Sequence, residues 1–134
     1  MKNIEISTRK DLLDVDFVAY NISSYYWAMG RSKEMMQLCI DNSLNFGVYL
    51  DGNQIGYARV VTDYVLFSYI LDVFIDKNYR GKGYSKMLLA YILEYKQLEK
   101  IKTWRLSTTD AHGLYRKFGF SSLSSPENLM ELIR

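Results

Sequence analysis

Apolar and polar residues follow two different spacings in the first 45 residues of the chain. Residues 2–7 alternate weakly between polar and apolar positions, which predicts a first strand. Two stretches with apolar residues at helical spacing come next, and Asp14 and Ser32 stand where residues that cap helices are expected. We therefore expect one helix from Asp14 to about Ser23 and a second from Ser32 to Asn45.

Three strand-like segments follow without a helix between them, at 46–50, 54–62 and 66–75. Asp51-Gly52-Asn53 joins the first two, and an Asp-Gly pair between apolar runs is a strong signal for a hairpin. Asp63-Tyr64 turns the chain again before the third segment. Strands joined by such short turns pair in antiparallel order, so the pattern predicts a meander.

A helix and a further strand are predicted after the meander. Residues 84–95 place tyrosine, leucine, isoleucine and methionine at spacings of three and four, which is typical of a helix with one wide apolar face. Residues 103–107 read as the next strand. Because a helix joins this strand to the preceding one, the two should lie parallel through a right-handed crossover.

The remaining elements are short. A helix from Ala111 to Phe118 is expected to end at the glycine that follows it. Phe120 and residues 129–133 are expected to supply two closing strands. The element order is then β-α-α-β-β-β-α-β-α-β-β. We expect one α+β domain over residues 1–134, with a mixed sheet in which the meander feeds a single parallel pair.

A glycine-rich segment connects the meander to the long helix: Arg80-Gly81-Lys82-Gly83-Tyr84-Ser85. Its glycines let the backbone turn sharply and leave the N–H groups unobstructed. The helix start adds unpaired N–H groups and the positive end of the helix dipole. Strand, glycine loop and helix start together favour phosphate binding, and the alternative is a plain tight turn into a helix. The candidate donors are the N–H groups of Gly81, Lys82, Gly83, Tyr84 and Ser85, and Arg80 adds positive charge.

Composition narrows the possible functions. Seventeen basic against fifteen acidic residues give a net charge of +2, which argues against nucleic-acid binding driven by bulk charge. A single cysteine and a single histidine exclude an internal disulfide and a metal site built from several such ligands. No run of ~18 apolar residues and no apolar N-terminal signal segment occur, so we expect no membrane partner and a cytoplasmic location. The glycine segment matches neither the P-loop nor the dinucleotide-binding motif.

The glycine segment and the element order resemble the GNAT superfamily of acetyl-coenzyme-A-dependent N-acetyltransferases. The family signature Gln/Arg-x-x-Gly-x-Gly/Ala reads Arg80-x-x-Gly83-x-Ser85 here, with a mild departure at the serine. A second segment resembles the family's fourth-helix motif: Asp110-Ala111-x-x-Leu114-Tyr115-x-Lys117-Phe118-Gly119-Phe120. The resemblance extends from about Asn45 to the end of the chain, and the preceding residues match only in forming two helices.

The resemblance implies transfer of an acetyl group from acetyl-CoA to a primary amine of a small molecule, peptide or protein, without a metal, by a monomer or homodimer. The alternative is an acyl-CoA-binding sensor without turnover. Backbone groups of Val73 and Ile75 would hold the pantetheine arm. Thr108 replaces an asparagine that contacts the cofactor in many members. Tyr115 matches the tyrosine that gives a proton to the leaving thiolate, and the alternative is a tyrosine that only packs.

Further candidates lie on the acceptor side. Asp72 is a lone carboxylate in an apolar strand, where unpaired carboxylates are rare. It is a candidate base or amine-binding group, and the alternative is pairing with Arg59 or with a backbone donor. Asp63 and Asp110 are the other candidates for the base. The first two helices and their loop are expected to form the acceptor pocket, where aromatic rings could hold a cation. Its candidate residues are Tyr25, Tyr26, Trp27 and Arg31.

Overall fold

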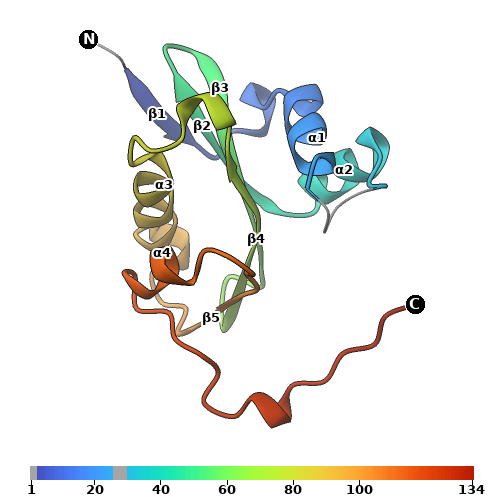
Figure 1. The fold of residues 1–134 in the computed structure, drawn as a ribbon, viewed down its shortest axis with the longest axis vertical. Helices are drawn as coiled ribbons and strands as arrows, with labels where there is room; N and C mark the ends of the chain where they lie inside the picture. The colour runs from blue at the N-terminus through green and yellow to red at the C-terminus, as the bar shows by residue number, and fades with distance from the viewer. Residues whose placement is uncertain (1–2, 26–29) are drawn as a thin grey trace.

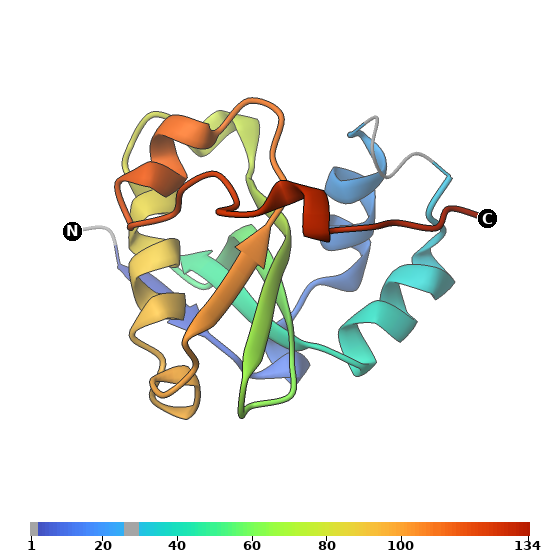
Figure 2. The same cartoon turned by 90° about the horizontal axis from the view of Figure 1, so that it is seen from below.

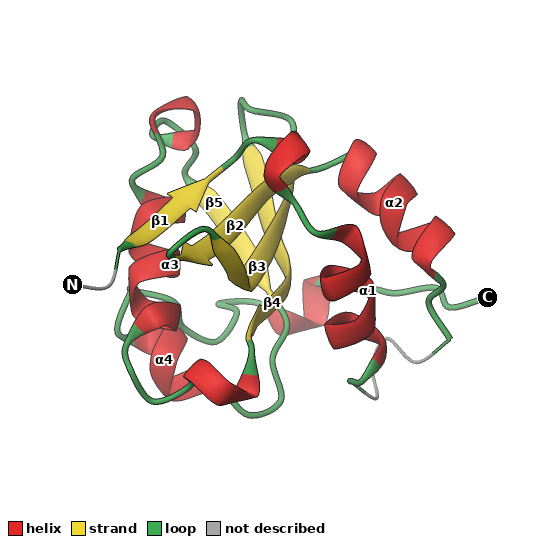
Figure 3. Ribbon diagram, turned by 90° about the horizontal axis from the view of Figure 1, so that it is seen from above, coloured by secondary structure: helices red, strands yellow, loops and turns green. Residues whose placement is uncertain are grey.

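The computed structural model describes residues 3–25 and 30–134. Its centre is a five-stranded sheet in the order β1-β2-β3-β4-β5 (Figures 1 and 3). Each strand is antiparallel to the next, except that β4 and β5 are parallel. Both the predicted meander and the predicted parallel pair are confirmed. The strands are β1 (Ile4–Ser7), β2 (Leu44–Leu50), β3 (Asn53–Thr62), β4 (Phe67–Ile75) and β5 (Thr103–Leu106).

Two helices, α1 (Val15–Ser23) and α2 (Lys33–Asp41), begin at the predicted caps. The Asp14 carboxylate accepts a hydrogen bond from the Phe17 N–H at 3.0 Å, and the Ser32 hydroxyl accepts one from the Met35 N–H at 3.1 Å. Helix α2 ends earlier than the sequence predicted. The reason is that Asn45 already pairs with β3, while its side-chain amide reaches back to the Ile40 carbonyl at 2.9 Å.

The two hairpins close by different devices. Asp51 and Gly52 have φ angles of 49° and 85°, the left-handed values of a tight hairpin turn. In the second turn one Asp63 carboxylate oxygen accepts hydrogen bonds from the N–H groups of residues 65, 66 and 67. These bonds hold the pKa of Asp63 below its usual value. Asp63 therefore closes a turn, which argues against its use as a base.

The second half contributes α3 (Tyr84–Leu93) and α4 (His112–Arg116). Single 3₁₀ turns fill several connections: η1 (Lys10–Leu12), η3 (Lys77–Tyr79), η4 (Lys96–Leu98) and η5 (Pro126–Asn128). No helix in the described part of the chain is long and apolar enough to cross a membrane.

The two closing strands predicted at Phe120 and at 129–133 are not formed within the described residues. Residues 121–125 supply four serines and one leucine, so they have little apolar surface to bury. Pro126 then opens a 3₁₀ turn, and every residue from 121 to 134 is exposed. Residues 121–124 still border a cavity together with Trp104 and Arg105 of β5. The rest of the chain then leaves the body of the molecule and runs toward the side of α1 and α2 (Figures 1 and 2).

The sheet separates two buried clusters. One lies between the sheet and α3 and α4, and it includes Phe46, Val60, Leu88, Ile92 and Tyr115. The other lies under α1 and α2, and its buried members are Val18, Ile22, Met36, Ile40, Tyr57 and Phe74. Figure 1 shows the two helix layers on opposite sides of the strands.

Candidate active site

Strands β4 and β5 separate part-way along the sheet. Their pairing covers only Phe67–Ile70 against Thr103–Leu106. From Leu71 to Ile75, the edge of β4 that faces β5 has no strand partner among the described residues. This stretch contains Val73 and Ile75, the residues whose backbone groups are expected to hold a pantetheine arm.

A bulge in β4 lies at the point of separation. Arg59 pairs with Leu71 and Tyr57 pairs with Phe74, so Asp72 and Val73 together face a single residue of β3. Asp72 has a φ of 54°, a left-handed value that residues other than glycine seldom adopt. Such bulges often change the direction of side chains and backbone groups beside active sites.

The glycine loop leads from β4 into α3 and borders a cavity. Gly81 and Gly83 have φ angles of 77° and 85°, and Gly83 is the residue that precedes α3. A Cβ atom built on either glycine would meet no atom within 4 Å, so the space above both is open. The cavity measures about 190 Å³ and is lined by Ile75, Tyr79, Arg80, Gly81, Gly83, Tyr84, Ser85, Lys86 and Leu114.

The side chains of Lys82 and Arg80, two predicted residues of the glycine loop, contact other parts of the protein. The Lys82 ammonium lies 5.9 Å from the centre of the Tyr79 ring. Arg80 donates from Nε to the Ile75 carbonyl at 3.0 Å and from Nη2 to the Tyr25 hydroxyl at 2.9 Å. Arg80 therefore braces the loop against β4 and the end of α1, and one of the two Ile75 backbone groups is already engaged.

Tyr115 lies on α4 and is 8% exposed. Its ring packs edge-on against Phe120, with 5.8 Å between the ring centres. Burial, followed by the nearby Asp110 carboxylate, raises the pKa of Tyr115 above its ordinary value. The phenol therefore keeps its proton at neutral pH. Leu114, the preceding residue, lines the cavity beside the glycine loop, so α4 and that loop meet at one site.

Thr108 stabilises the connection that leads into α4. Its hydroxyl oxygen accepts a hydrogen bond from the Ala111 N–H at 3.0 Å. The hydroxyl can still donate one further hydrogen bond, because it carries both a donor and acceptor lone pairs. Asp110 does not cap this helix through its side chain.

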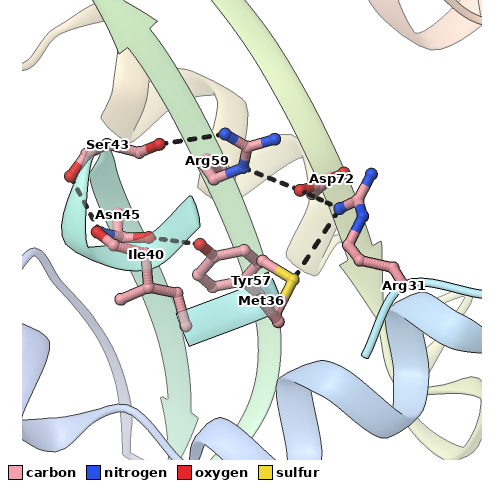
Figure 4. Close-up of polar contacts among 8 residues, drawn as sticks. All are labelled: Arg31, Met36, Ile40, Ser43, Asn45, Tyr57, Arg59 and Asp72. Atoms are coloured by element: carbon pink, nitrogen blue, oxygen red, sulfur yellow. Dashed lines mark hydrogen bonds and ion pairs between the residues drawn. The ribbon is translucent and has the colours of Figure 1, made fainter. Parts of the chain in front are cut away.

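Asp72 is buried between two arginines on the α1–α2 side of the sheet (Figure 4). Its Oδ2 accepts hydrogen bonds from Arg31 Nη1 and from Arg59 Nε, each at 2.8 Å. Its Oδ1 is also buried and has no hydrogen-bond partner among the described residues. The two guanidinium groups exceed the one carboxylate by a single positive charge. Pairing with Arg59 was expected as an alternative, whereas the contact with Arg31 was not foreseen.

A polar network extends from this ion pair and was missed in the sequence. Arg59 Nη1 donates to the Ser43 hydroxyl at 3.0 Å, and the Tyr57 hydroxyl donates to Asn45 Oδ1. Asn45 is only 1% exposed, so its side chain needs these partners. The only signal available in the sequence was an asparagine inside an apolar run. Figure 4 shows the network beside the Asp72 ion pairs.

Other predicted site residues have different outcomes. Tyr25 contacts Arg80 of the glycine loop, which brings the end of α1 next to that loop. Tyr26 and Trp27 lie outside the described residues. Within residues 3–25 and 30–134, no group of three or more histidine, cysteine, aspartate or glutamate side chains could hold a metal ion.

Comparison with known proteins identifies the family. The model of the acetyltransferase (GNAT) domain matches residues 41–122. A crystal structure of a GNAT-family protein from Xanthomonas campestris, xcc2953, is 38% identical, covers 98% of this chain and 94% of its own, and superimposes with a TM-score of 0.95. The Gibberella zeae protein FG08082, which carries an acetyltransferase name, is 28% identical over 84% of this chain and 75% of its own.

A more distant structure shows the same fold with a ligand. A Clostridium acetobutylicum protein solved with acetyl-CoA is 16% identical, covers 99% of this chain and 96% of its own, and has a TM-score of 0.70. The residues that the family model matches include β2, β3, β4, the glycine loop, α3, β5 and α4. The chain therefore belongs to the GNAT family of acetyltransferases.

Proposed function

We propose that this chain transfers the acetyl group of acetyl-CoA directly to a primary amine while both substrates are bound. The observation that carries the proposal is the cavity that the glycine loop shares with Leu114 of α4. It joins the glycine loop, the candidate phosphate-binding segment, to the helix that bears the buried phenol of Tyr115. Phosphate binding and thiolate protonation are two of the tasks that acetyl-CoA requires of a protein in this reaction.

Acetyl-CoA would lie along the unpaired edge of β4. The backbone N–H groups from Gly81 to Ser85, together with the start of α3, would hold the pyrophosphate. Val73 would offer backbone hydrogen bonds to the pantetheine arm, and so would the N–H of Ile75. Thr108 could donate its hydroxyl proton to the same arm. Arg80 would act by holding the loop in place, since its guanidinium is already bound to Ile75 and Tyr25.

Tyr115 is the group that we propose gives a proton to the departing thiolate of coenzyme A. A phenol is already protonated at neutral pH at its ordinary pKa of ~10, and burial raises the pKa of Tyr115 further. The protonated phenol is the form that a general acid needs. The cavity-lining position of Leu114 supports this role, because Tyr115 follows it directly on α4. Removing the phenol should therefore slow the step that releases the thiolate.

Asp72 is proposed to meet the acceptor amine. Its Oδ2 is engaged by Arg31 and Arg59, so Oδ1 is the atom left to accept a hydrogen bond or a proton. The bulge places Asp72 where β4 and β5 separate, on the side covered by α1 and α2. Tyr25 and Arg31 would border the same approach, and Tyr26 and Trp27 stand between these two residues in the sequence.

An assay of coenzyme A thiol release tests the proposal. The full chain is incubated with acetyl-CoA and a panel of polyamines, amino acids, aminoglycosides and peptides with free N-termini. With an accepted amine, Tyr115→Phe should lower kcat by about a hundredfold and leave the KM for acetyl-CoA nearly unchanged. Tyr20→Phe is the matched control, because that tyrosine is 77% exposed and should leave kcat unchanged.

Two results would contradict the proposal in different ways. Binding of acetyl-CoA by calorimetry without thiol release for any amine would favour the sensor alternative. Turnover that stays within about twofold in Tyr115→Phe would remove the proton-donor role and leave a packing role for this residue.

A further inference from the structure

Two arginine side chains converge on one oxygen of a buried carboxylate, on the side of the sheet that α1 and α2 cover (Figure 4). Arg31 and Arg59 both bond Asp72 Oδ2 at 2.8 Å, and the side chain of Asp72 is only 1% exposed. One carboxylate balances one guanidinium group, so one positive charge remains uncompensated in a partly buried place. Because an uncompensated charge is costly away from water, this arrangement suits an anion that arrives from outside.

Several N–H donors of these two arginines are unused. A guanidinium group carries about five such donors. Arg31 is engaged only through Nη1, which contacts Asp72 and the Met36 sulfur, whereas Arg59 is engaged through Nε with Asp72 and through Nη1 with Ser43. Arg31 Nε, Arg31 Nη2 and Arg59 Nη2 have no hydrogen-bond partner among the described residues, and none of them is fully buried. These three nitrogens therefore face solvent and can donate to a ligand.

We propose that the acceptor is a small amine with a carboxylate on the same carbon as its amino group or on the next one, that is, an α- or β-amino acid. This acceptor class rests on the proposed function and refines it. The amino group would meet Asp72 Oδ1, which is buried and has no partner in the described part of the chain. The carboxylate would accept hydrogen bonds from the unused nitrogens of Arg31 and Arg59, because a guanidinium fork matches a planar carboxylate.

The geometry of Asp72 limits the distance between the two groups of the ligand. Oδ1 and Oδ2 belong to one carboxyl group, and both arginines approach it through Oδ2. The places that receive the amino group and the carboxylate are therefore adjacent, which disfavours amines whose acidic group lies many bonds away.

Charge favours the same class of acceptor. An amino acid whose amino group is neutral, the form that attacks a thioester, carries one negative charge and so balances the excess positive charge beside Asp72. Polyamines and aminoglycosides would instead bring further positive charges close to the two arginines, which repel them.

Matched pairs of acceptors test the proposal in the thiol-release assay: free amino acids against the same amino acids with the carboxylate converted to an amide. The unaltered chain should have a kcat/KM for its best amino acid at least about tenfold above that for the amide, since hydrogen bonds between charged groups are lost in the amide. Intrinsic reactivity opposes this result, because the amide loses its ammonium proton more readily. ε-Aminocaproate, with a distant carboxylate, should be no better than the amide. Amides or polyamines used as well as amino acids would overturn the proposal and leave acetyl transfer itself established.

Arg31→Gln should reduce this preference by at least about tenfold, chiefly by raising the KM for the amino acid, because glutamine cannot form an ion pair with a carboxylate. The ratio between the two acceptors is measured, since a partial loss of folded protein lowers both rates alike. Arg31→Lys keeps the charge beside Asp72 without the fork and should reduce the ratio by a smaller factor. Arg9→Gln is the matched control: Arg9 pairs with Asp11, both side chains are 66% exposed, and the ratio should not change. Unchanged ratios in both Arg31 variants would overturn the proposal.

Thermal melting distinguishes a failure of this proposal from a failure of the proposed function. The chain loaded with coenzyme A is melted with millimolar concentrations of each common amino acid and of its amide. An accepted amino acid should raise the melting temperature, its amide should not, and Arg31→Gln should lose the rise. A rise that depends on Arg31, without thiol release from any amine, would contradict acetyl transfer and support the acceptor class. Thiol release only from amines without a carboxylate, with no rise from any amino acid, would overturn the acceptor class and support acetyl transfer.

Discussion

Two buried tyrosines of the sheet differ in what their hydroxyl groups contact. The Tyr57 hydroxyl donates to Asn45, and both residues are almost fully buried. The Tyr49 hydroxyl is buried without a hydrogen-bond partner in the described part of the chain. A buried polar group without a hydrogen-bond partner destabilises the folded state. When one member of a buried hydrogen-bonded pair is removed, the other member is left without a partner, and the folded state is destabilised as well.

The same substitution should therefore have opposite effects at these two positions. Tyr49→Phe should raise the free energy of unfolding by about 1 kcal/mol, because it removes an unsatisfied hydroxyl and keeps the ring. Tyr57→Phe should lower it by about 1–3 kcal/mol, because Asn45 Oδ1 loses its donor. Urea denaturation of both variants measures the two values. Equal losses at both positions would indicate that the Tyr49 hydroxyl has a partner after all.

Asp72 offers a second test at the scale of single residues. Asp72→Asn should lower the free energy of unfolding by about 3 kcal/mol, because it leaves two partly buried guanidinium groups without a counter-charge. Asp16→Asn is the matched control, since Asp16 pairs with Lys33 but the two side chains are 78% and 54% exposed. Asp16→Asn should change the free energy of unfolding by no more than about 0.5 kcal/mol.

The rate per folded molecule then separates two roles of Asp72. If Asp72 contacts the amine, the Asp72→Asn variant should lose most of its turnover even where it is fully folded. Full activity of the folded fraction would restrict Asp72 to its ion pairs. The sequence alone named Arg59 as one possible partner of Asp72. Arg31 could not be named, since only the packed fold brings it to a residue 41 positions away.

At the scale of elements, comparing a glycine of the glycine loop with a glycine elsewhere separates the effect of backbone strain from the effect of lost ligand contact. Gly83 and Gly52 both have a φ of 85°, and a Cβ atom on either would meet no atom within 4 Å. Only Gly83 lies beside the cavity of the glycine loop. The two positions therefore have the same backbone requirement and differ in their surroundings.

Gly83→Ala and Gly52→Ala should each lower the free energy of unfolding by about 1–2 kcal/mol, because alanine is strained in the left-handed region. Only Gly83→Ala should also weaken coenzyme A binding, by at least tenfold or ~1.4 kcal/mol, since its methyl group enters the space proposed for the pyrophosphate. Thermal melting gives the first quantity and calorimetry the second. Undiminished binding in Gly83→Ala would remove the phosphate role of the loop.

Elements with strong local signals could be predicted from the sequence. The caps at Asp14 and Ser32, the Asp-Gly hairpin and the apolar face of α3 each depend on residues that lie within a few positions of one another. The closing strands could not be predicted correctly by the same means. Residues 129–133 have a strand-like composition, but a strand needs a neighbour, and these residues lie away from β5 (Figure 1).

For the whole molecule, buried tyrosines predict how stability changes at high pH. Burial raises the pKa of Tyr49 to about 12 and also raises the pKa values of Tyr57 and Tyr115. In the unfolded chain these phenols ionise near a pH of ~10. The contribution of these phenols to the free energy of unfolding is therefore fully present below that pH. It is lost as the pH rises through their folded-state pKa values, because the unfolded state ionises first.

The melting temperature should thus change little up to a pH of about 10 and fall steeply above it. Tyr49→Phe should make the melting temperature fall less steeply between this pH and about 12. Tyr20→Phe, which replaces an exposed tyrosine, should leave that fall unchanged. Thermal melts at a series of pH values measure both curves. An unchanged slope in Tyr49→Phe would mean that this phenol ionises as readily in the folded state as in the unfolded one.

The separation of the core into two clusters has a consequence for how the protein can diversify. Neighbouring strand residues face opposite layers: Tyr57 and Phe74 pack under α1 and α2, while Ala58 and Ile75 belong to the cluster beneath α3. The described contacts that tie the α1–α2 layer to the proposed catalytic elements include Asp72 with Arg31 and Arg80 with Tyr25. Substitutions in the α1–α2 layer that keep Tyr25 and Arg31 should therefore leave the cluster beneath α3 intact. Under the proposed function, they would change the choice of amine and not the binding of acetyl-CoA.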